Sequence, residues 1–245
     1  MKSIVVIPAR YGSSRFEGKV LAKQTGKYLV QHTYEQARCA KKANRILIAA
    51  DDVRVLQACS QFDASCIMTR VDHPSGTDRI AEAVLKIEAD IIVNLQADEP
   101  EIDPAYIDLI IELLIENPDA DMATLLAPFE TAEQIANPNV VKAVTDQKGR
   151  ALYFSRSVIP YDRGGQGIGT VNQYKRHLGI YAYRKSFLQA FTQLPPGQLE
   201  QIEKLEQLRA LENGFTIITA MVPRAWDGID TEEQYAEFVK RHENS

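Results

Sequence analysis

Apolar residues recur in two rhythms along the first half of the chain. Short runs without polar alternation are typical of buried β-strands, and they occur at residues 4–7, 46–49, 66–68, 91–95 and 122–126. Stretches with apolar side chains at helical spacing lie between them, at residues 30–40, 53–60, 78–88 and 104–116. Strands that are buried on both faces and alternate with helices pair in parallel. The pattern therefore predicts an α/β fold with a mostly parallel mixed sheet flanked by helices.

The regular alternation of predicted strands and helices ends after Asn137. Residues 140–145, 151–154 and 178–183 predict three further strands. The segment 164–169 contains four glycines, and we expect it to form a mobile loop.

Two helices are expected near the end of the chain. Leucine and isoleucine side chains occupy one face of a predicted helix over residues 199–213, which a glycine then ends. Glu203 and Gln207 are four residues apart on this helix, so they share a flank; exposed helix polarity is the alternative interpretation. Thr231 is placed to cap a last helix that runs through His242.

Composition narrows the class of protein. The chain has 245 residues, of which 45% are hydrophobic and 25% charged, values typical of a compact globular protein. Lys and Arg total 28 against 33 Asp and Glu, a formal net charge of -5. We therefore expect no general attraction to nucleic acid or anionic lipid, and any phosphate must be held by local groups. No apolar segment reaches the roughly 18 residues of a membrane span, so no membrane insertion is expected.

The cysteine spacing and the lack of linker segments narrow the class of protein further. Cys39, Cys59 and Cys66 lack C-x-x-C spacing, which favours reduced thiols of a cytoplasmic protein over disulfides or a zinc site. No internal repeat and no Pro-rich or Ser-rich linker interrupts the sequence. We expect a single domain over residues 1–245.

The segment that follows the first predicted strand, residues 8–19, suits a phosphate. Its glycines permit close backbone approach, while Arg10, Arg15 and Lys19 would neutralise negative charge. The segment differs from a Walker A loop, since five residues separate its two glycines and Val20 stands at the Ser/Thr position. It also lacks G-x-G-x-x-G, which argues against a dinucleotide-dependent dehydrogenase. A solvated basic surface loop remains the alternative interpretation.

Two carboxylates are candidates for a metal site. Asp98 follows the predicted strand 91–95, at the edge of the sheet where ligands bind in parallel α/β folds. Asp230 lies just before the last predicted helix, where an N-cap role is the alternative. Mg²⁺ usually takes one or two protein carboxylates together with phosphate oxygens, so a Mg²⁺-triphosphate complex would suit this pair.

Two further segments carry polar candidates. In residues 69–79, Ser75 and Thr77 would either read a base edge or cap the next helix, and His73 is an unconvincing catalyst. His177 follows two basic residues at the start of a predicted strand, which suits an acidic substrate. A structural histidine is equally compatible with this position.

Six motifs together resemble one family. Their sequences and their order are similar to those of CMP-Kdo synthetase, also called 3-deoxy-manno-octulosonate cytidylyltransferase. The match extends from the first strand to Thr231 and so covers nearly the whole chain. The motifs occupy residues 8–19, 69–79, 96–100, 151–156, 176–181 and 205–209.

The resemblance implies a fold and an activity. It implies a nucleotide-diphospho-sugar transferase fold of Rossmann-like type, in a cytoplasmic homodimer that couples CTP to Kdo with Mg²⁺ and releases pyrophosphate for lipopolysaccharide biosynthesis. Within the single domain it implies a nucleotide-binding part over about residues 1–136 and a sugar-binding and dimerisation lobe over 137–220. Residues 221–245 would return to the main sheet.

The resemblance also implies roles for individual residues. Catalysis would depend on Lys19, Arg10 and Asp98. The magnesium carboxylates would be Asp98 and Asp230. CTP would be bound by Pro8, Ala9, Arg10, Ser13, Lys19, Arg70, Ser75, Gly76 and Thr77. The sugar acid would be held by Arg15, Gln96, Arg163, His177, Glu203 and Gln207.

The sequence departs from the family pattern at a few positions. The common Arg-Leu-Pro-Gly-Lys-Pro becomes residues 15–20 here, with Glu17 as an added negative charge and Val20 in place of proline. Ala97 stands where the family has glycine; if that position needs a positive φ, alanine would cost stability or shift Asp98. Two alternatives follow: a nucleotide-binding paralogue with impaired turnover, and a cytidylyltransferase for another ulosonic acid such as 8-amino-Kdo or a sialic acid.

Overall fold

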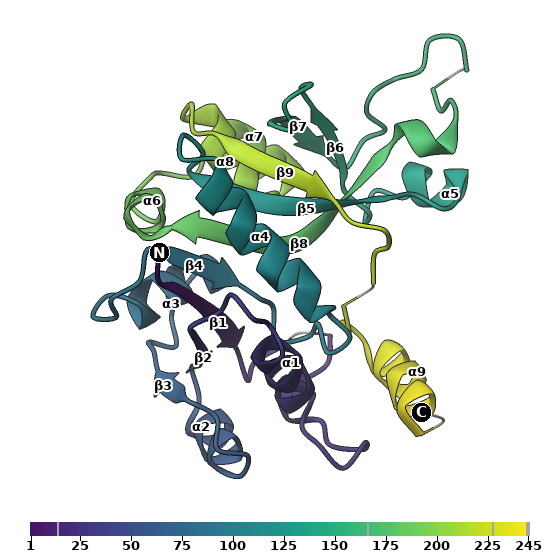
Figure 1. Ribbon diagram of the computed structural model, residues 1–245. Coiled ribbons are helices and arrows are strands. Elements are labelled where there is room, and N and C mark those ends of the chain that lie inside the picture. Colours follow the sequence, from purple (N-terminus) through teal and green to yellow (C-terminus); the bar gives the residue numbers. More distant parts are fainter. Residues whose placement is uncertain (14, 166, 227, 244–245) are drawn as a thin grey trace. The chain divides into compact units, whose positions relative to one another are not determined.

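The computed structural model describes residues 1–13, 15–165, 167–226 and 228–243 (Figure 1). The chain forms two compact units. The first comprises Met1–Ile111 and Trp226–Ser245, and the second comprises Glu112–Ala225. The first unit is therefore built from both ends of the sequence.

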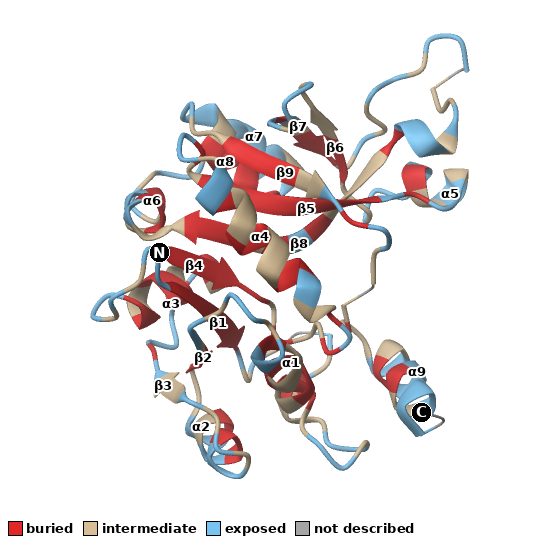
Figure 2. Ribbon diagram, viewed as in Figure 1, coloured by how far each residue is buried: buried red, intermediate tan, exposed pale blue. Residues whose placement is uncertain are grey.

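The first unit contains a parallel sheet with the strand order β3-β2-β1-β4. Its strands are β1 (Ser3–Ala9), β2 (Arg45–Ala50), β3 (Cys66–Met68) and β4 (Ile91–Asn94). All three pairings are parallel, as predicted from the uninterrupted apolar runs. Every residue of β1 and β4 is buried, and Figure 2 shows both as red arrows.

The helices of the first unit follow the strands in alternation. They are α1 (Leu29–Arg38), α2 (Val53–Ser60), α3 (Gly76–Ala83), the beginning of α4 (Pro104–Glu116), and α9 (Glu232–Glu243), with a short 3-10 turn η1 (Lys19–Leu21). Thr231 caps α9 as predicted, because its Oγ1 accepts the Gln234 N–H at 3.3 Å. Leu29 of α1 packs with Ile229, Tyr235 and Phe238 in one core cluster, which ties the end of the chain to its beginning.

The second unit has a mixed sheet. β5 (Met122–Pro128) pairs antiparallel with β8 (Lys175–Arg184) and parallel with β9 (Ile217–Met221). β6 (Lys142–Thr145) pairs antiparallel with both β7 (Ala151–Ser155) and β8. Its helices are α5 (Ala132–Ala136), α6 (Lys185–Phe191), α7 (Gln198–Glu203) and α8 (Gln207–Glu212), with a 3-10 turn η2 (Val171–Gln173). The apolar pattern predicted neither β9 nor α6.

The single helix predicted over residues 199–213 is wrong. The structure breaks it between α7 and α8 at Lys204, which has a left-handed φ of 54°. Arg156 donates from Nε to the Glu203 carbonyl at 2.7 Å and from Nη2 to the Lys204 carbonyl at 3.4 Å. These bonds satisfy carbonyls at the end of α7 and let the chain turn. Glu203 and Gln207 consequently do not share a helix flank.

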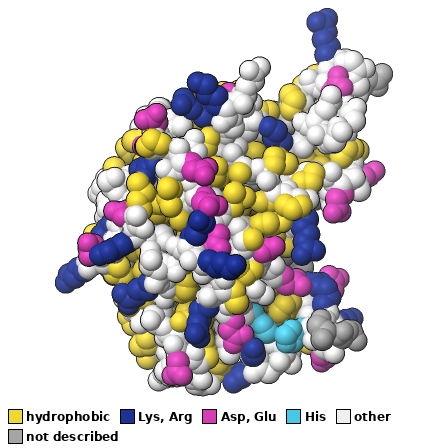
Figure 3. Space-filling model, viewed as in Figure 1, with side chains coloured by type: hydrophobic (Ala, Val, Ile, Leu, Met, Phe, Trp, Pro, Cys, Tyr) yellow, Lys and Arg dark blue, Asp and Glu magenta, His cyan; other side chains and the backbone are white. Residues whose placement is uncertain are grey.

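Charged side chains of both signs are interspersed over the face of the molecule in Figure 3, which agrees with the small net charge. The three cysteines are free thiols: Cys39 is exposed, Cys66 is partly buried and Cys59 is buried. Within the described ranges, every helix is too short or too polar to cross a bilayer.

Candidate active site

The candidate site is a cavity of about 450 Å³ at the carboxyl ends of β1 and β4 in the first unit. β1 lies between β2 and β4, so the connections that leave these strands open a crevice at this edge, where parallel α/β sheets bind ligands. The cavity is lined by Pro8, Arg10, Gly12, Ser13, Arg15, Lys19, Val20, Gln96, Ala97, Asp98 and Asp230.

The basic loop that follows β1 is fixed at Tyr11. The Tyr11 N–H donates to Asp51 Oδ1 at 2.9 Å, and its carbonyl accepts the Gly18 N–H at 3.1 Å. Gly18 has a φ of 66°, and a Cβ at this position would lie 3.3 Å from the Tyr11 hydroxyl. Both facts favour glycine here. The guanidinium carbon of Arg54 lies 3.4 Å from the centre of the Tyr11 ring, which holds the ring in place.

Three charged side chains from distant parts of the sequence meet in this cavity. Lys19 Nζ donates to Asp98 Oδ2 at 2.6 Å and to Asp230 Oδ1 at 3.1 Å. The Lys19 side chain is only 11% exposed, so these contacts are weakly screened by water. The Ile229 N–H donates to the Asp98 carbonyl at 2.9 Å, which holds the two acidic segments together.

The alternative role of Asp230 as a helix cap is not observed, because the neighbouring Thr231 caps α9. The Asp230 carboxylate instead accepts from Lys19 and forms an ion pair with Arg15 at 2.9 Å. The Asp230 backbone N–H donates to the Gln234 side chain at 2.7 Å. The segment therefore presents its acid to the cavity.

The donor set fits a magnesium ion. Asp98 and Asp230 supply hard carboxylate oxygens, and both already converge on one cationic group, the Lys19 ammonium. The described residues form no cluster of three or more histidine, cysteine or acidic side chains arranged for a metal. Two carboxylates completed by phosphate oxygens are the usual arrangement for Mg²⁺.

The loop between β3 and α3 carries the residues expected to bind the base. Ser75 caps α3, since its Oγ accepts the Asp78 N–H at 3.2 Å and donates to the Asp78 carboxylate at 2.7 Å. A Cβ on Gly76 would lie 3.4 Å from the Pro8 ring. This glycine therefore brings the start of α3 close to the basic segment 8–19, which we call the phosphate loop. Arg70 is exposed and Thr77 is buried.

Of the residues expected to hold the sugar, two lie in the first unit. Arg15 and Gln96 both line the cavity, and Gln96 Nε2 donates to Asn94 Oδ1 at 2.9 Å. They line the same cavity as Lys19 and the two acids. The remaining four candidates belong to the second unit.

In the second unit, His177 and Glu203 both lie against the end of β7. The His177 ring packs edge-on against Phe154 at 4.9 Å and its Nε2 lies 3.1 Å from Thr124 Oγ1. Burial lowers the pKa of His177 to about 3, so the ring is neutral at physiological pH. Glu203 accepts from Ser155 Oγ at 2.5 Å and from the Arg156 N–H at 2.9 Å.

The other two candidates of the second unit differ in exposure. Gln207 is 3% exposed, and its Nε2 has no hydrogen-bond partner among the described residues. Arg163 lies on the exposed loop between β7 and β8.

The departures from the family pattern are accommodated. Ala97 is buried and is not among the described non-glycine residues with positive φ, so alanine introduces no backbone strain there. Its carbonyl accepts from Thr33 Oγ1 at 3.0 Å. Glu17 is exposed and its charge acts on Arg54, while Phe16 packs 5.7 Å from the Tyr235 ring.

Sequence reasoning missed Asp51, which anchors the phosphate loop through Tyr11. The signal was present, because Asp51 follows a buried parallel strand as Asp98 does. His73, an unconvincing catalyst from its sequence, is buried against Glu82, with which it forms a short contact.

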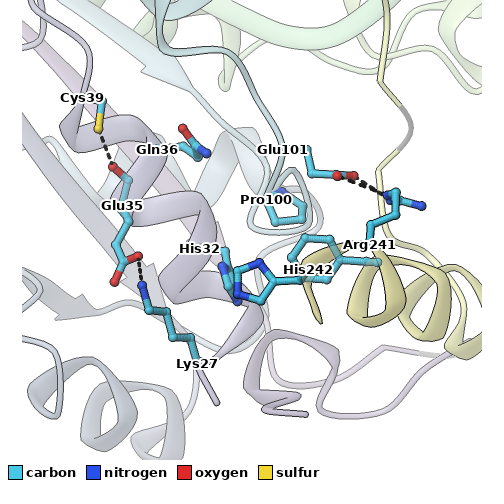
Figure 4. A pocket seen from close by; sticks show the side chains of 10 residues that line it. Lys27, His32, Glu35, Gln36, Cys39, Pro100, Glu101, Arg241 and His242 are labelled. Atoms are coloured by element: carbon cyan, nitrogen blue, oxygen red, sulfur yellow. Dashed lines mark hydrogen bonds and ion pairs between the residues drawn. The ribbon is translucent and has the colours of Figure 1, made fainter. Parts of the chain in front are cut away.

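A second cavity of about 530 Å³ lies in the first unit between α1, the turn at Pro100 and α9 (Figure 4). Its charged side chains are largely paired across its walls. Lys27 binds Glu35 at 2.7 Å and Arg241 binds Glu101 at 2.6 Å. Burial and the nearby His242 lower the pKa of His32 to about 4. The cavity is larger than the candidate site, yet it lacks converging acids and a basic glycine-containing loop.

Comparisons with known proteins agree with this site. A family model described as cytidylyltransferase matches residues 4–217. The 3-deoxy-manno-octulosonate cytidylyltransferase of Rhodopirellula baltica is 45% identical over 249 residues, which cover 100% of both chains. The enzyme of the same name from Syntrophobacter fumaroxidans is 47% identical over 98% of this chain and 96% of its own.

A solved structure gives the same result. The structure of CMP:2-keto-3-deoxy-manno-octonic acid synthetase complexed with CTP has a TM-score of 0.94 and 42% sequence identity, over 100% of this chain and 99% of that chain. The likeness covers the parallel sheet of the first unit and the mixed sheet of the second. The chain belongs to the 3-deoxy-manno-octulosonate cytidylyltransferase family.

Proposed function

We propose that the protein transfers the cytidylyl group of CTP to 3-deoxy-D-manno-octulosonate (Kdo), giving CMP-Kdo and pyrophosphate for lipopolysaccharide biosynthesis. Its relatives are named for this activity, and the similar solved structure is complexed with CTP. The observation that carries the proposal is the meeting of Lys19, Asp98 and Asp230 in one cavity beside the basic loop.

The reaction explains why these groups are needed. The anomeric hydroxyl oxygen of Kdo bonds to the α-phosphorus of CTP, the bond from that phosphorus to pyrophosphate breaks, and the hydroxyl proton is released. Negative charge builds on the phosphoryl oxygens and the leaving group, so positioning and charge stabilisation supply most of the rate. Arg10, Ser13 and Lys19 line the cavity and would donate to the phosphates.

Asp98 and Asp230 would hold Mg²⁺ together with phosphate oxygens of CTP. An ion bound there would neutralise charge on the triphosphate. Lys19 would exchange its two carboxylate partners for phosphate oxygens when CTP enters. Mg²⁺ would then take the place of the Lys19 ammonium between Asp98 and Asp230, so neither carboxylate would be left without a positive partner.

The other site residues keep the roles that the family resemblance implies. Pro8, Ala9 and the loop with Arg70, Ser75, Gly76 and Thr77 would bind the nucleotide. Kdo would be held by Arg15, Gln96, Arg163, His177, Glu203 and Gln207. We further propose a homodimer that works in the cytoplasm, where CTP is made, with residues 137–220 as the sugar-binding and dimerisation part.

A pyrophosphate-release assay with CTP and Kdo, run with and without Mg²⁺, tests the proposal. We expect turnover that requires both substrates and the metal. Parallel reactions with 8-amino-Kdo and with a sialic acid check the substrate, and a faster reaction with either would replace Kdo in the proposal. CTP binding without pyrophosphate release under any of these conditions would indicate a paralogue with impaired turnover.

A further inference from the structure

A buried ion pair lies behind the phosphate loop. Arg79, in the first turns of α3, is fully buried, and its Nη2 lies 3.3 Å from Asp51 Oδ2. The Asp51 side chain is only 8% exposed. Neither residue lines the candidate cavity.

The pair connects the two loops that are proposed to hold CTP. On one side, Asp51 Oδ1 accepts the Tyr11 N–H at 2.9 Å, which anchors the phosphate loop. On the other side, Arg79 Nη1 donates to Thr69 Oγ1 at 2.6 Å and to the Arg70 carbonyl at 3.1 Å, which anchors the loop proposed to read the base. The connections that follow β1, β2 and β3 are thus joined through one carboxylate and one guanidinium.

Stability alone is a poor explanation for this arrangement. A buried ion pair contributes little net stability, because desolvation of the charges offsets their attraction. The Asp51–Arg79 contact is single rather than bidentate, and Arg79 Nε has no partner among the described residues. Burial and the nearby charge of Arg10 also lower the pKa of Arg79, and the charge of Asp51 opposes this shift.

We propose that Asp51 and Arg79 are positioning residues that set the separation between the phosphate loop and the base-reading loop, and so determine how well CTP fits. This inference rests on the proposed function. The pair acts through the backbone of Tyr11 and Arg70 and does not contact the substrate. Losing either member lets the two loops move independently, and a misplacement of about 1 Å can lower rates by about a hundredfold.

The test uses Asp51→Asn, Arg79→Lys and the double variant. Asparagine keeps one oxygen for the Tyr11 N–H but loses the charge that pairs with Arg79. We expect kcat/KM for CTP to fall by about tenfold to a hundredfold in each single variant, while KM for Kdo at saturating CTP stays within twofold. The double variant should lose no more than the worse single variant, since the residues act as one unit.

Glu88→Gln is the matched control. It removes one acid from the same unit, where Glu88 is 84% exposed and pairs with Lys2 at 2.7 Å. If Asp51→Asn does not fold, Thr69→Val provides a milder change, because valine has the same shape and removes one acceptor of Arg79.

The outcomes separate the two proposals. Folded variants with a lower melting temperature but an unchanged KM for CTP would mean that the pair is purely structural, and the inference would be overturned. Wild-type protein that neither binds CTP nor releases pyrophosphate would overturn the proposed function and this inference with it. Wild-type turnover with a selective loss of CTP affinity in the variants would support both.

Discussion

The two units use their charged side chains in opposite ways. In the first unit, Lys19, Asp98 and Asp230 point into a cavity and bind one another, so their partners can be exchanged for a ligand. In the second unit, both Glu203 oxygens accept bonds that hold α7 to the end of β7. A substitution in the first unit should therefore change chemistry, whereas one in the second should first change stability.

The largest effect is expected for Asp98→Asn. The variant loses the charge that binds Lys19 and that would hold Mg²⁺, so we expect metal-dependent pyrophosphate release to fall by at least about a thousandfold. The fold should persist, because Asp98 is partly exposed and its backbone bond to Ile229 is kept. Circular dichroism provides the control, and near-normal turnover in a folded variant would refute the metal assignment.

Lys19→Met should have the next largest effect. Methionine retains the length of the side chain but removes the ammonium that is proposed to move to the phosphates. We expect kcat to fall by about a hundredfold to a thousandfold, the effect of removing one charge-stabilising donor. Turnover within tenfold of the wild type would show that Lys19 serves only to pair the two acids.

Glu203→Gln tests whether the second unit uses this carboxylate for stability. Glutamine offers one acceptor oxygen to two donors and turns its amide N–H groups toward Ser155 or Arg156. The free energy of unfolding should fall by about 1–3 kcal/mol. Urea unfolding measures this loss, and KM for Kdo should rise while KM for CTP is unchanged. Unchanged stability would contradict the structural role.

One histidine in each unit is expected to make the stability of the fold depend on pH. The pKa values of His32 in the first unit and His177 in the second are lowered to about 4 and about 3, from 6.5. Below pH 6.5 the unfolded chain gains protons that the folded chain does not, so stability is lost as pH falls. We expect each histidine to account for about 2 kcal/mol between pH 7 and pH 5.

Unfolding curves of His32→Gln and His177→Gln at both pH values measure the two contributions. Each variant should show a smaller difference between pH 7 and pH 5 than the wild type. Wild-type stability that is equal at the two pH values would contradict both lowered pKa values.

The smallest effect is expected for Ala97→Gly, which restores the residue common in the family. Alanine has no unfavourable φ here, so glycine relieves no strain and removes a buried methyl group. We expect a loss of about 1 kcal/mol in the free energy of unfolding and a kcat within twofold of the wild type. A large gain in kcat would show that alanine displaces Asp98.

Much of the first unit could be predicted because its signals are local. Uninterrupted apolar runs identified the parallel strands, and the rule that ligands bind beyond such strands singled out the loop after β1 and Asp98. The cap at Thr231 is also local. The approach of Asp230 to Lys19 spans 211 positions, and no spacing rule predicts it. The sequence offered Asp230 as a second metal carboxylate with a helix cap as the alternative, and the family resemblance favoured the metal role.

The second unit was harder to predict because its decisive contacts are distant in sequence. The apolar spacing favoured one helix over residues 199–213, but Arg156 binds carbonyls 47 and 48 positions away and ends the first half at Glu203. The role of Glu203 likewise depends on Ser155, which lies on another strand. The spacing of apolar residues indicates which face of a helix or strand is buried. It does not indicate which distant side chain will end that helix or strand.

The division of the first unit between the two ends of the chain has a consequence for biosynthesis. A nascent polypeptide that stops before Trp226 already carries the basic loop and Asp98, but it lacks the acid that completes the pair with Asp98. Premature termination before Asp230 would therefore give an inert product and not a partly active one. Catalytic competence would depend on translation through Asp230.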